Sequence, residues 1–459
     1  MTGGNVCGTT AAAAMAIPND LLVSEVLSRL PVKSLLRFSS VCRSWCAAVA
    51  DPAFARRHLT LSRRAAAATP PSVLAVVTCT DADPDNAAPP EDLISFHRIR
   101  PGRQPSSAAA AADVVVDVEQ MQELALECSN PLLRSSHCDG LVAVAADVGR
   151  IFVCNPATRE FVVLPPGSPG PYDYRREEAA VLSVDPRTGV HVVTRCLYQH
   201  YGCHTDEHTG EQSLEYDIVH EVFVHGPSGS GGWEATTAPP CPVELVVPPA
   251  HARGAFYWAA NDQSDPAQRE HPNALLRFAI HDGVFDVVPL PPGVAFMAPD
   301  DRDALTELGG EICYMRPTGA TAFDFWMLPA AADAEHDEEE EGHGRWSLRW
   351  CVDFGGGDPI DDLTPLYMAP DGTLTVDMAR MIYRLDKLNN FLEKVVDMAA
   401  VYWHLVEQLG LGNYYDYSEK DYRLEIQNGR WRRVQDGDGP ALPSIQSLFT
   451  YVESLIQIN

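Results

Sequence analysis

Four residues near the middle of the chain are of the types that bind transition metals. They are His200, Cys203, His204 and His208, which offer the imidazole nitrogens and the thiolate sulfur that zinc prefers. A zinc site brings such ligands into a tetrahedron, and the spacing of these four fits no strong zinc signature. Turn-forming and acidic residues flank them, which favours an exposed loop. We therefore expect neither a metal nor a cofactor here.

Other reactive residue types in the sequence have an ordinary structural interpretation. Cys42 and Cys46 lie one helical turn apart, a spacing that suits packing better than a redox pair. The acidic run from Asp333 to Glu341 is typical of a solvated loop, although a basic protein would also be attracted to it. Five tryptophans fall in or beside expected strands, which favours core packing over recognition: Trp233, Trp258, Trp326, Trp346 and Trp350.

Known catalytic motifs are missing from the sequence. It contains no G-x-S-x-G nucleophile elbow, no P-loop and no H-E-x-x-H zinc site. Pairs of catalytic carboxylates cannot be chosen from 63 acidic residues without a fold. We therefore predict no catalytic residue and expect a protein that is not an enzyme.

Charge divides the chain into two unequal parts. The 459 residues carry a formal charge of -29, which argues against nucleic acid as a partner because a phosphate backbone is bound by clustered Lys and Arg. Residues 17–64 hold eight basic and three acidic side chains and are therefore net +5, so the remainder is -34. A short basic segment on an acidic body suggests an acidic protein partner, although a solvated basic face would have the same charge.

Cysteine spacing and hydropathy bear on the compartment. The twelve cysteines form no C-x-x-C pair, and no Asn-x-Ser/Thr acceptor occurs. No stretch approaches the length of apolar residues that a membrane span needs, and residues 1–16 lack the basic start of a signal peptide. We expect a protein of the cytoplasm, the nucleus or both, without a membrane.

Short helices are predicted near the start of the chain. After a small-residue segment at 1–16, which we expect to be disordered, Pro18 begins a helix in which Leu22, Val26 and Leu30 share one face. Pro31 ends this helix, and two further short helices follow, one through Leu35 and one through Trp45. Three helices bury too little surface to be stable alone, so they pack either on another protein or on the rest of this chain.

From about Ser72 onward the pattern changes to short strands separated by Pro, Gly, Asn and Asp. Strands over 141–145, 151–154 and 161–164 begin ten residues apart and predict a β-meander. Many antiparallel strands over nearly four hundred residues favour a propeller over a sandwich, because radial repetition protects the sheet edges. The number of blades stays open, since the region 393–416 suits a strand or a helix.

The helical segment strongly resembles the plant F-box. The resemblance rests on Ile17-Pro18-x-Asp20-Leu21-Leu22, Val26-Leu27-x-Arg29-Leu30-Pro31-Val32-Lys33-Ser34-Leu35-Leu36-Arg37-Phe38, Val41-Cys42-Arg43-Ser44-Trp45 and Asp51-Pro52-x-Phe54-x-x-x-His58-Leu59. It implies binding to a Skp1-type adaptor and, through that adaptor, to the cullin of an SCF ubiquitin ligase. The residues expected to face the adaptor are Pro18, Leu21, Leu22, Leu30, Pro31, Leu35 and Leu36. Val26, Val41 and Trp45 suit either this surface or internal packing.

Phrases farther along resemble the F-box-associated domain of the same plant family. They are Cys138-Asp139-Gly140-Leu141-Val142, Val153-Cys154-Asn155-Pro156-Ala157-Thr158-Arg159-Glu160, Gly254-Ala255-Phe256-Tyr257-Trp258, Phe323-Asp324-Phe325-Trp326-Met327-Leu328 and Tyr451-Val452-Glu453-Ser454-Leu455. The resemblance implies a kelch-related propeller that recognises the substrate of the ligase.

These observations predict an α+β multidomain chain. The expected plan is a disordered segment at 1–16, a three-helix F-box at 17–61, a linker at 62–71 and an all-β propeller-like domain at 72–459. The expected function is that of a non-catalytic substrate receptor, which holds the adaptor through the F-box and an unknown protein target through the propeller. The alternative is a propeller enzyme or glycan-binding protein whose F-box serves tethering or self-turnover.

Overall fold

The computed structural model describes the chain in segments. They are residues 18–68, 72–81, 91–100, 117–126, 134–146, 150–169, 179–205, 212–225, 231–244, 247–260, 274–292, 303–328, 346–354, 359–360, 363–369, 371–378, 381–386, 391–397, 401, 423–427, 430–434 and 444–458. The disorder predicted for residues 1–16 lies outside them.

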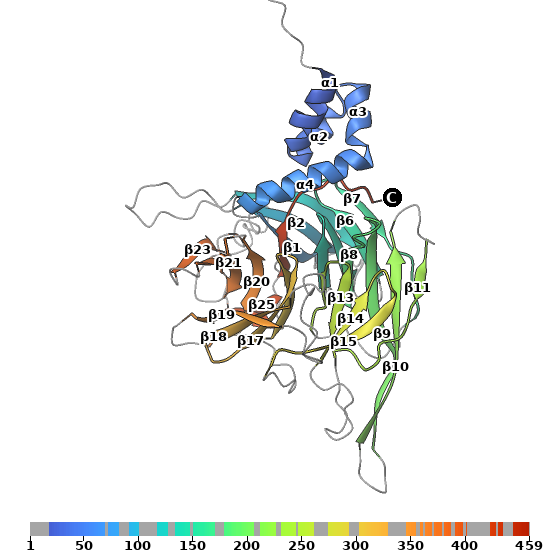
Figure 1. Ribbon diagram of the computed structural model, residues 1–459, viewed down its shortest axis with the longest axis vertical. Coiled ribbons are helices and arrows are strands. Elements are labelled where there is room, and N and C mark those ends of the chain that lie inside the picture. Colours follow the sequence, from blue (N-terminus) through green and yellow to red (C-terminus); the bar gives the residue numbers. More distant parts are fainter. Residues whose placement is uncertain are drawn as a thin grey trace, which may run out of the picture.

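The N-terminal part is a bundle of helices that projects from the sheets (Figure 1). Its first segment combines α1 (Asn19–Leu21), a π-helical turn η1 (Leu22–Val26) and a 3₁₀ turn η2 (Leu27–Arg29), and it is followed by α2 (Val32–Phe38), α3 (Arg43–Val49) and α4 (Pro52–Ala68). Prolines stand at or just before three of these starts, where a missing N–H costs little. The bundle therefore has a fourth helix, and that helix continues through residues 62–68 of the predicted linker.

The π-helical turn changes which residues of the first segment face inward. Hydrogen bonds of the i→i+5 type take up more residues per turn than an α-helix does. Leu27 is consequently buried, whereas Val26 is exposed. The predicted shared face of Leu22, Val26 and Leu30 is wrong at Val26 for this reason.

Six four-stranded antiparallel sheets form the rest of the fold, each numbered here as a blade from its innermost strand outward. Blade 1 consists of β26 (Ser444–Tyr451), β1 (Ser72–Asp81), β2 (Glu91–Arg100) and β3 (Asp117–Leu126); blade 2 of β4 (Arg134–Cys138), β5 (Leu141–Ala146), β6 (Arg150–Asn155) and β7 (Glu160–Val163); and blade 3 of β8 (Ala179–Val184), β9 (His191–Thr205), β10 (Gln212–Val224) and β11 (Trp233–Ala235). Blade 4 consists of β12 (Ala250–Ala252), β13 (Ala255–Ala259), β14 (Ala274–Ala279) and β15 (Val284–Pro289); blade 5 of β16 (Ala304–Leu308), β17 (Glu311–Pro317), β18 (Ala322–Leu328) and β19 (Ser347–Asp353); and blade 6 of β20 (Leu363–Met368), β21 (Leu374–Met378), β22 (Met381–Asp386) and β23 (Phe391–Asp397).

The six blades close into a ring. Each innermost strand contacts the next, in the order β26, β4, β8, β12, β16, β20 and back to β26. Closure depends on β26, because this last strand of the chain pairs with β1, the first strand. A further hairpin, β24 (Arg423–Gln427) with β25 (Arg430–Val434), precedes β26 and contacts it through β25. The chain is thus a six-bladed propeller preceded by a helical module.

Hydrophobic clusters fill the interfaces between neighbouring blades. In β5, Val142 and Val144 pack toward blade 1, whereas Leu141, Ala143 and Ala145 pack toward blade 3. Successive side chains of a strand point to opposite faces, so a strand covered on both faces is apolar throughout. The same division occurs in β1, β13 and β17. This explains the continuous apolar runs in the sequence.

Several sequence predictions can be compared with these elements. The meander predicted at 141–145, 151–154 and 161–164 corresponds to β5, β6 and β7. The five tryptophans all contact clusters between blades, with Trp258 fully buried, so the packing role is confirmed. Part of the ambiguous region 393–416 is strand, in β23, and most of the remainder lies outside the described residues.

Candidate functional site

The helical module presents some of the predicted adaptor-facing residues and buries others. Pro18, Leu21, Pro31 and Leu36 are exposed, Leu21 by 52% and Leu36 by 40% of their surface. Leu22 and Leu30 are half-buried. Leu35 is 0% exposed and belongs to the module's own core, which corrects its predicted outward position. Because Val32 and Leu35 lie on the inner face of α2, Leu36 rather than Leu35 faces outward.

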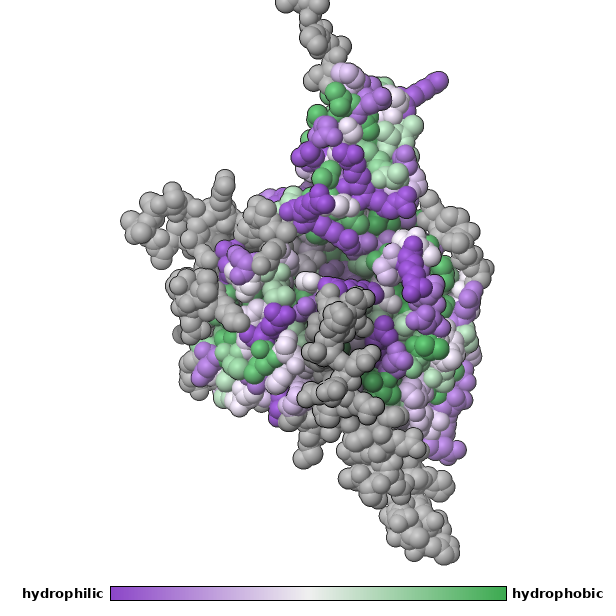
Figure 2. Space-filling view, in the orientation of Figure 1, coloured by the Kyte–Doolittle hydropathy of each residue, from purple (hydrophilic) through white to green (hydrophobic). Residues whose placement is uncertain are grey.

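Exposed apolar side chains gather on this module. We call the group Leu21, Val26, Leu36, Phe38 and Val41 the module surface; Val41 is 62% exposed. Figure 2 shows apolar residues at the surface of the projecting module, interspersed with hydrophilic ones. Isolated exposed apolar residues are ordinary, whereas contiguous exposed apolar patches are typical of interaction sites.

Trp45 belongs to the packing beneath this surface. Its indole N–H donates to the Asn19 side chain over 2.9 Å, which ties α3 to α1. Its ring meets Phe38 edge to face, with centroids 5.8 Å apart. Of the three residues with two possible roles, Val26 and Val41 are therefore exposed, whereas Trp45 packs internally. Cys42 and Cys46 are also exposed, so their predicted packing role is wrong.

The C-terminal residues of the propeller domain complete the core of the module. Leu455, only 4% exposed, packs in the cluster that contains Leu27, Val32 and Leu35. The backbone N–H of Val32 donates to the Glu453 carboxylate over 3.0 Å. A helix N-terminus favours such an anion, because its first N–H groups lack partners within the helix. The module therefore packs on its own chain as well as exposing an apolar surface.

Ion pairs reinforce this junction between the module and blade 1. Lys33 of α2 lies 2.8 Å from Glu119 of β3. Arg98 of β2 is buried and pairs with Glu119 and with Glu453. Solvent screens this buried arginine poorly from its two carboxylates, and removing either partner would leave an uncompensated buried charge. The junction therefore joins α2, β2, β3 and the C-terminal segment in one network.

Blade 2 holds the C-terminal segment (452–458) in place. The Asn155 side-chain amide donates to the carbonyls of Ser454, over 3.1 Å, and Ile456, over 2.9 Å. Gly140 has φ +81°, and a Cβ there would lie 2.6 Å from the Val452 carbonyl oxygen. Only glycine fits this turn. Gly140 and Asn155, which belong to the two family-like phrases of this region, thus both contact the C-terminal segment.

The predicted metal-binding residues are placed differently from the expectation. His200 lies in β9 and is exposed, with its ring 3.9 Å from the Glu215 carboxylate across the hairpin. Cys203 and His204 belong to the same strand, so the predicted loop is a β-ribbon there. Their side chains, and His208 altogether, lie outside the described residues. In Figure 1 the β9–β10 ribbon extends from the propeller on the side away from the helices.

A different group with metal-ligand types lies beside α4. The ligand-type atoms of Cys138, Asp139 and His191 lie within 4.8 Å of one another. The sequence could not predict this proximity, because blade 2 supplies the first two residues and blade 3 supplies His191. Asp139 pairs with Arg63 of α4. Burial raises the pKa of the Cys138 thiol to about 12 and lowers that of His191 to about 4, so both are neutral near pH 7. A neutral thiol and an arginine-paired carboxylate fit a junction contact better than a metal centre.

Among the residues that the structure describes, no helix is long and apolar enough to cross a membrane.

Comparisons with known proteins agree with this architecture. Residues 17–57 match the F-box domain model, and residues 86–380 match the model described as "F-box protein At3g26010-like, beta-propeller". The putative F-box protein At1g12855 of Arabidopsis thaliana is 23% identical over 70% of this chain and 66% of its own length. The putative F-box/kelch-repeat protein At1g12870 of the same plant is 22% identical over 69% of each chain.

Solved structures are more distant. BamB from Moraxella catarrhalis covers 81% of this chain and 90% of its own, at 10% identity and a TM-score of 0.30, a likeness from which nothing follows about function. The helical module and the six-bladed propeller, together with the two family matches, show that this chain belongs to the family of F-box proteins with an At3g26010-like β-propeller.

Proposed function

We propose that this protein is the non-catalytic substrate receptor of an SCF-type ubiquitin ligase. Its F-box implies a Skp1-like adaptor as partner, and that adaptor connects the chain to the cullin. The single observation that supports the docking role best is the module surface, where five large apolar side chains remain exposed on a unit that already has its own core. Such residues bury favourably against another protein.

The docking residues follow from exposure. Pro18, Leu21, Pro31 and Leu36 of the predicted set form the adaptor contact, together with Val41 and the rest of the module surface. Exposed Arg37 and Arg43 supply a basic rim. An apolar centre with a charged rim is the usual anatomy of a specific protein interface.

The propeller holds the protein to be ubiquitinated. Catalysis belongs to other subunits, and this chain contributes proximity, because a bound target has a high local concentration near the charged ubiquitin carrier. The contacts of α2 with Glu119 and Glu453, through Lys33 and the Val32 N–H, support this role because they join the helices to the propeller. The eight cysteines whose side chains the structure describes are unpaired, which supports a reducing compartment; for this function that is the cytoplasm, the nucleus or both.

A capture experiment tests the receptor role. The tagged full chain and the variant L21A/L36A/V41A are expressed with ligase activity blocked, and bound proteins are identified by mass spectrometry. We expect the variant to lose the adaptor and cullin while retaining the same targets, because the propeller is unchanged. A point variant is preferable to deletion of residues 17–61, which would expose Leu455 and Glu453.

The control variant V284A/V287A removes exposed apolar surface from β15, far from the helices in sequence. It should keep adaptor, cullin and targets alike. A variant L21A/L36A/V41A that still brings down adaptor and cullin would contradict the docking role, and an absence of any shared protein target would contradict the receptor role.

A further inference from the structure

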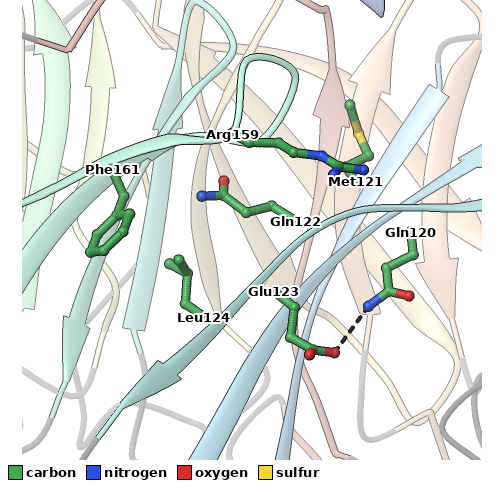
Figure 3. A pocket seen from close by; sticks show the side chains of 7 residues that line it. All are labelled: Gln120, Met121, Gln122, Glu123, Leu124, Arg159 and Phe161. Atoms are coloured by element: carbon green, nitrogen blue, oxygen red, sulfur yellow. Dashed lines mark hydrogen bonds between the residues drawn. The ribbon is translucent and has the colours of Figure 1, made fainter.

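A cavity of about 450 Å³ opens between blades 1 and 2, beside the helical module. One wall is β3, and the other is formed by Arg159 and Phe161, at the β6–β7 turn and in β7 (Figure 3). Glu119, which precedes the β3 wall, pairs with Lys33 of α2. The cavity is thus adjacent to the module but is not part of the module surface.

The cavity follows an open strand edge. Its β3 wall consists of the consecutive residues 120–124. Because side chains of a strand alternate between its two faces, a cavity bordered by consecutive residues of the outer strand β3 extends along the edge of that strand. Within the described residues, β3 pairs with β2 alone and β7 pairs with β6 alone. Open edges of this kind present N–H and C=O groups to an extended chain.

A β-bulge shapes this wall. Phe96 of β2 is opposite Gln122, and the next residue, His97, is opposite Gln120, so Met121 is the extra residue. A bulge re-aims side chains locally, and Met121 and Gln122 are accordingly both buried although they are consecutive. The side-chain oxygen of Gln122 is buried and accepts no hydrogen bond from any described residue. This oxygen can therefore accept a hydrogen bond from a ligand bound in the cavity.

Charge and apolar surface lie side by side in the cavity. Arg159 is exposed, and its guanidinium has no ion-pair partner among the described residues. Phe161 is 52% exposed, and Leu124 provides a buried apolar floor. In Figure 3, Gln122 lies between Arg159 and Leu124, with Phe161 beside them. The Glu123 carboxylate, by contrast, already accepts a hydrogen bond from Gln120 over 3.0 Å.

We propose that this groove binds an extended segment of the protein target in which an acidic side chain stands next to an apolar one. The acidic group pairs with Arg159, the apolar group covers Phe161 and Leu124, and the segment's backbone lies along the edge of β3. This inference rests on the proposed receptor function and deepens it. A target held here lies beside the module that binds the adaptor.

The acidic body of the protein does not forbid an acidic ligand. At physiological salt, charges farther than about 8 Å are largely screened, whereas the contact with Arg159 is direct. A charge-assisted hydrogen bond contributes about tenfold or more in affinity. The local pair therefore outweighs the distant field.

Selection from a phage-displayed library of short random peptides, on the immobilised full chain at physiological salt, tests the groove. Selected peptides should combine an acidic residue with a neighbouring apolar one, and should bind both R159E and F161A about tenfold more weakly. Selection on R159E should instead enrich Lys or Arg beside the apolar residue. The control V287A, on the open edge of β15, should bind the first peptides as the wild type does.

Adaptor affinity is measured on the same preparations, and all three variants should retain it. Peptides that bind wild type and R159E equally, or a failure to select any peptide dependent on Phe161, would overturn the groove. With adaptor binding intact, that result leaves the receptor function standing, so the two failures are distinguishable.

Discussion

His220 illustrates how the core constrains a single titratable residue. Its ring nitrogens lie 2.6 Å from the Thr194 hydroxyl and 2.5 Å from the Thr236 hydroxyl. Phe278 packs on the ring with centroids 4.3 Å apart. Burial lowers the pKa of His220 to about 3, so it stays neutral in the fold. The unfolded chain, in contrast, protonates this residue near its usual pKa of about 6.5.

This difference predicts acid sensitivity. Between about pH 6.5 and pH 3 the unfolded state binds one more proton at His220 than the fold does, so stability falls as pH falls, by up to about 1.4 kcal/mol per pH unit. Above that window the group has no effect. The variant H220Q does not titrate, so its loss of unfolding free energy between pH 6.5 and pH 5 should be smaller by about 2 kcal/mol in urea titrations.

The control V287A replaces an exposed side chain that does not titrate, so it should leave the pH dependence of unfolding unchanged. An H220Q variant with the same pH dependence as the wild type would contradict the assignment of His220 as a buried neutral base.

For single residues, the sequence indicated which residue types belong to the docking module better than it indicated which of them are exposed. The F-box pattern identified Leu21 and Leu36, which are exposed, but it also included Leu35, which is buried. Periodicity could not separate them, because the cluster that buries Leu35 also includes Leu455, more than four hundred residues away. Similarly, Cys138 and His191 come together only once blades 2 and 3 are adjacent.

Among the elements, the C-terminal segment 452–458 has the widest influence. It follows β26 and accepts two hydrogen bonds from the Asn155 side chain. Its Leu455 is part of the core of the helical module. The sequence marked its first four residues as family-like, but nothing local indicated that they contact helices. A segment without regular hydrogen bonding of its own is placed by tertiary contacts alone.

We expect L455A to loosen the module selectively. Replacing a buried leucine with alanine lowers the free energy of unfolding by about 2–5 kcal/mol. Here the lost packing lies in the cluster that contains Val32 and Leu35. Hydrogen exchange followed by mass spectrometry should show faster exchange in α2 and α4, with β13 and β14 unchanged. The exposed Leu348 on β19 gives the control L348A, which should alter neither. Unchanged protection in α2 of L455A would show that the junction does not support the module.

The helical and strand elements themselves were predictable in kind. Prolines at 18 and 31 mark helix starts, and the apolar runs mark strands that are covered on both faces. The π-helical turn at Leu22–Val26 was not predictable, because periodicity analysis assumes one period for the whole helix. The helix α4 (Pro52–Ala68) was not predicted: three helices were expected, and residues 62–68 were assigned to the linker, where the small alanines gave no apolar face.

For the whole molecule, ring closure determines what the ends of the chain do. The strand β26 pairs with β1. The residues that follow β26 contact the helices that precede β1, so the N-terminal module and the propeller share one junction. Strand spacing predicted a propeller, but six blades could be counted only from the sheet topology, since neighbouring repeats differ in sequence and length. The candidate groove likewise could not be predicted from the sequence, because β3 and the β6–β7 turn belong to different blades.

The central claim is that the module surface binds a Skp1-type adaptor, and calorimetric titration of the adaptor into the full chain tests it most directly. Each truncated side chain removes about 1–2 kcal/mol of apolar burial, so L21A/L36A/V41A should bind at least about a hundredfold more weakly. Its melting temperature should match that of the wild type, since all three residues are exposed, and V284A/V287A should bind normally. Equal adaptor affinity of wild type and L21A/L36A/V41A, with both folded, would contradict the account.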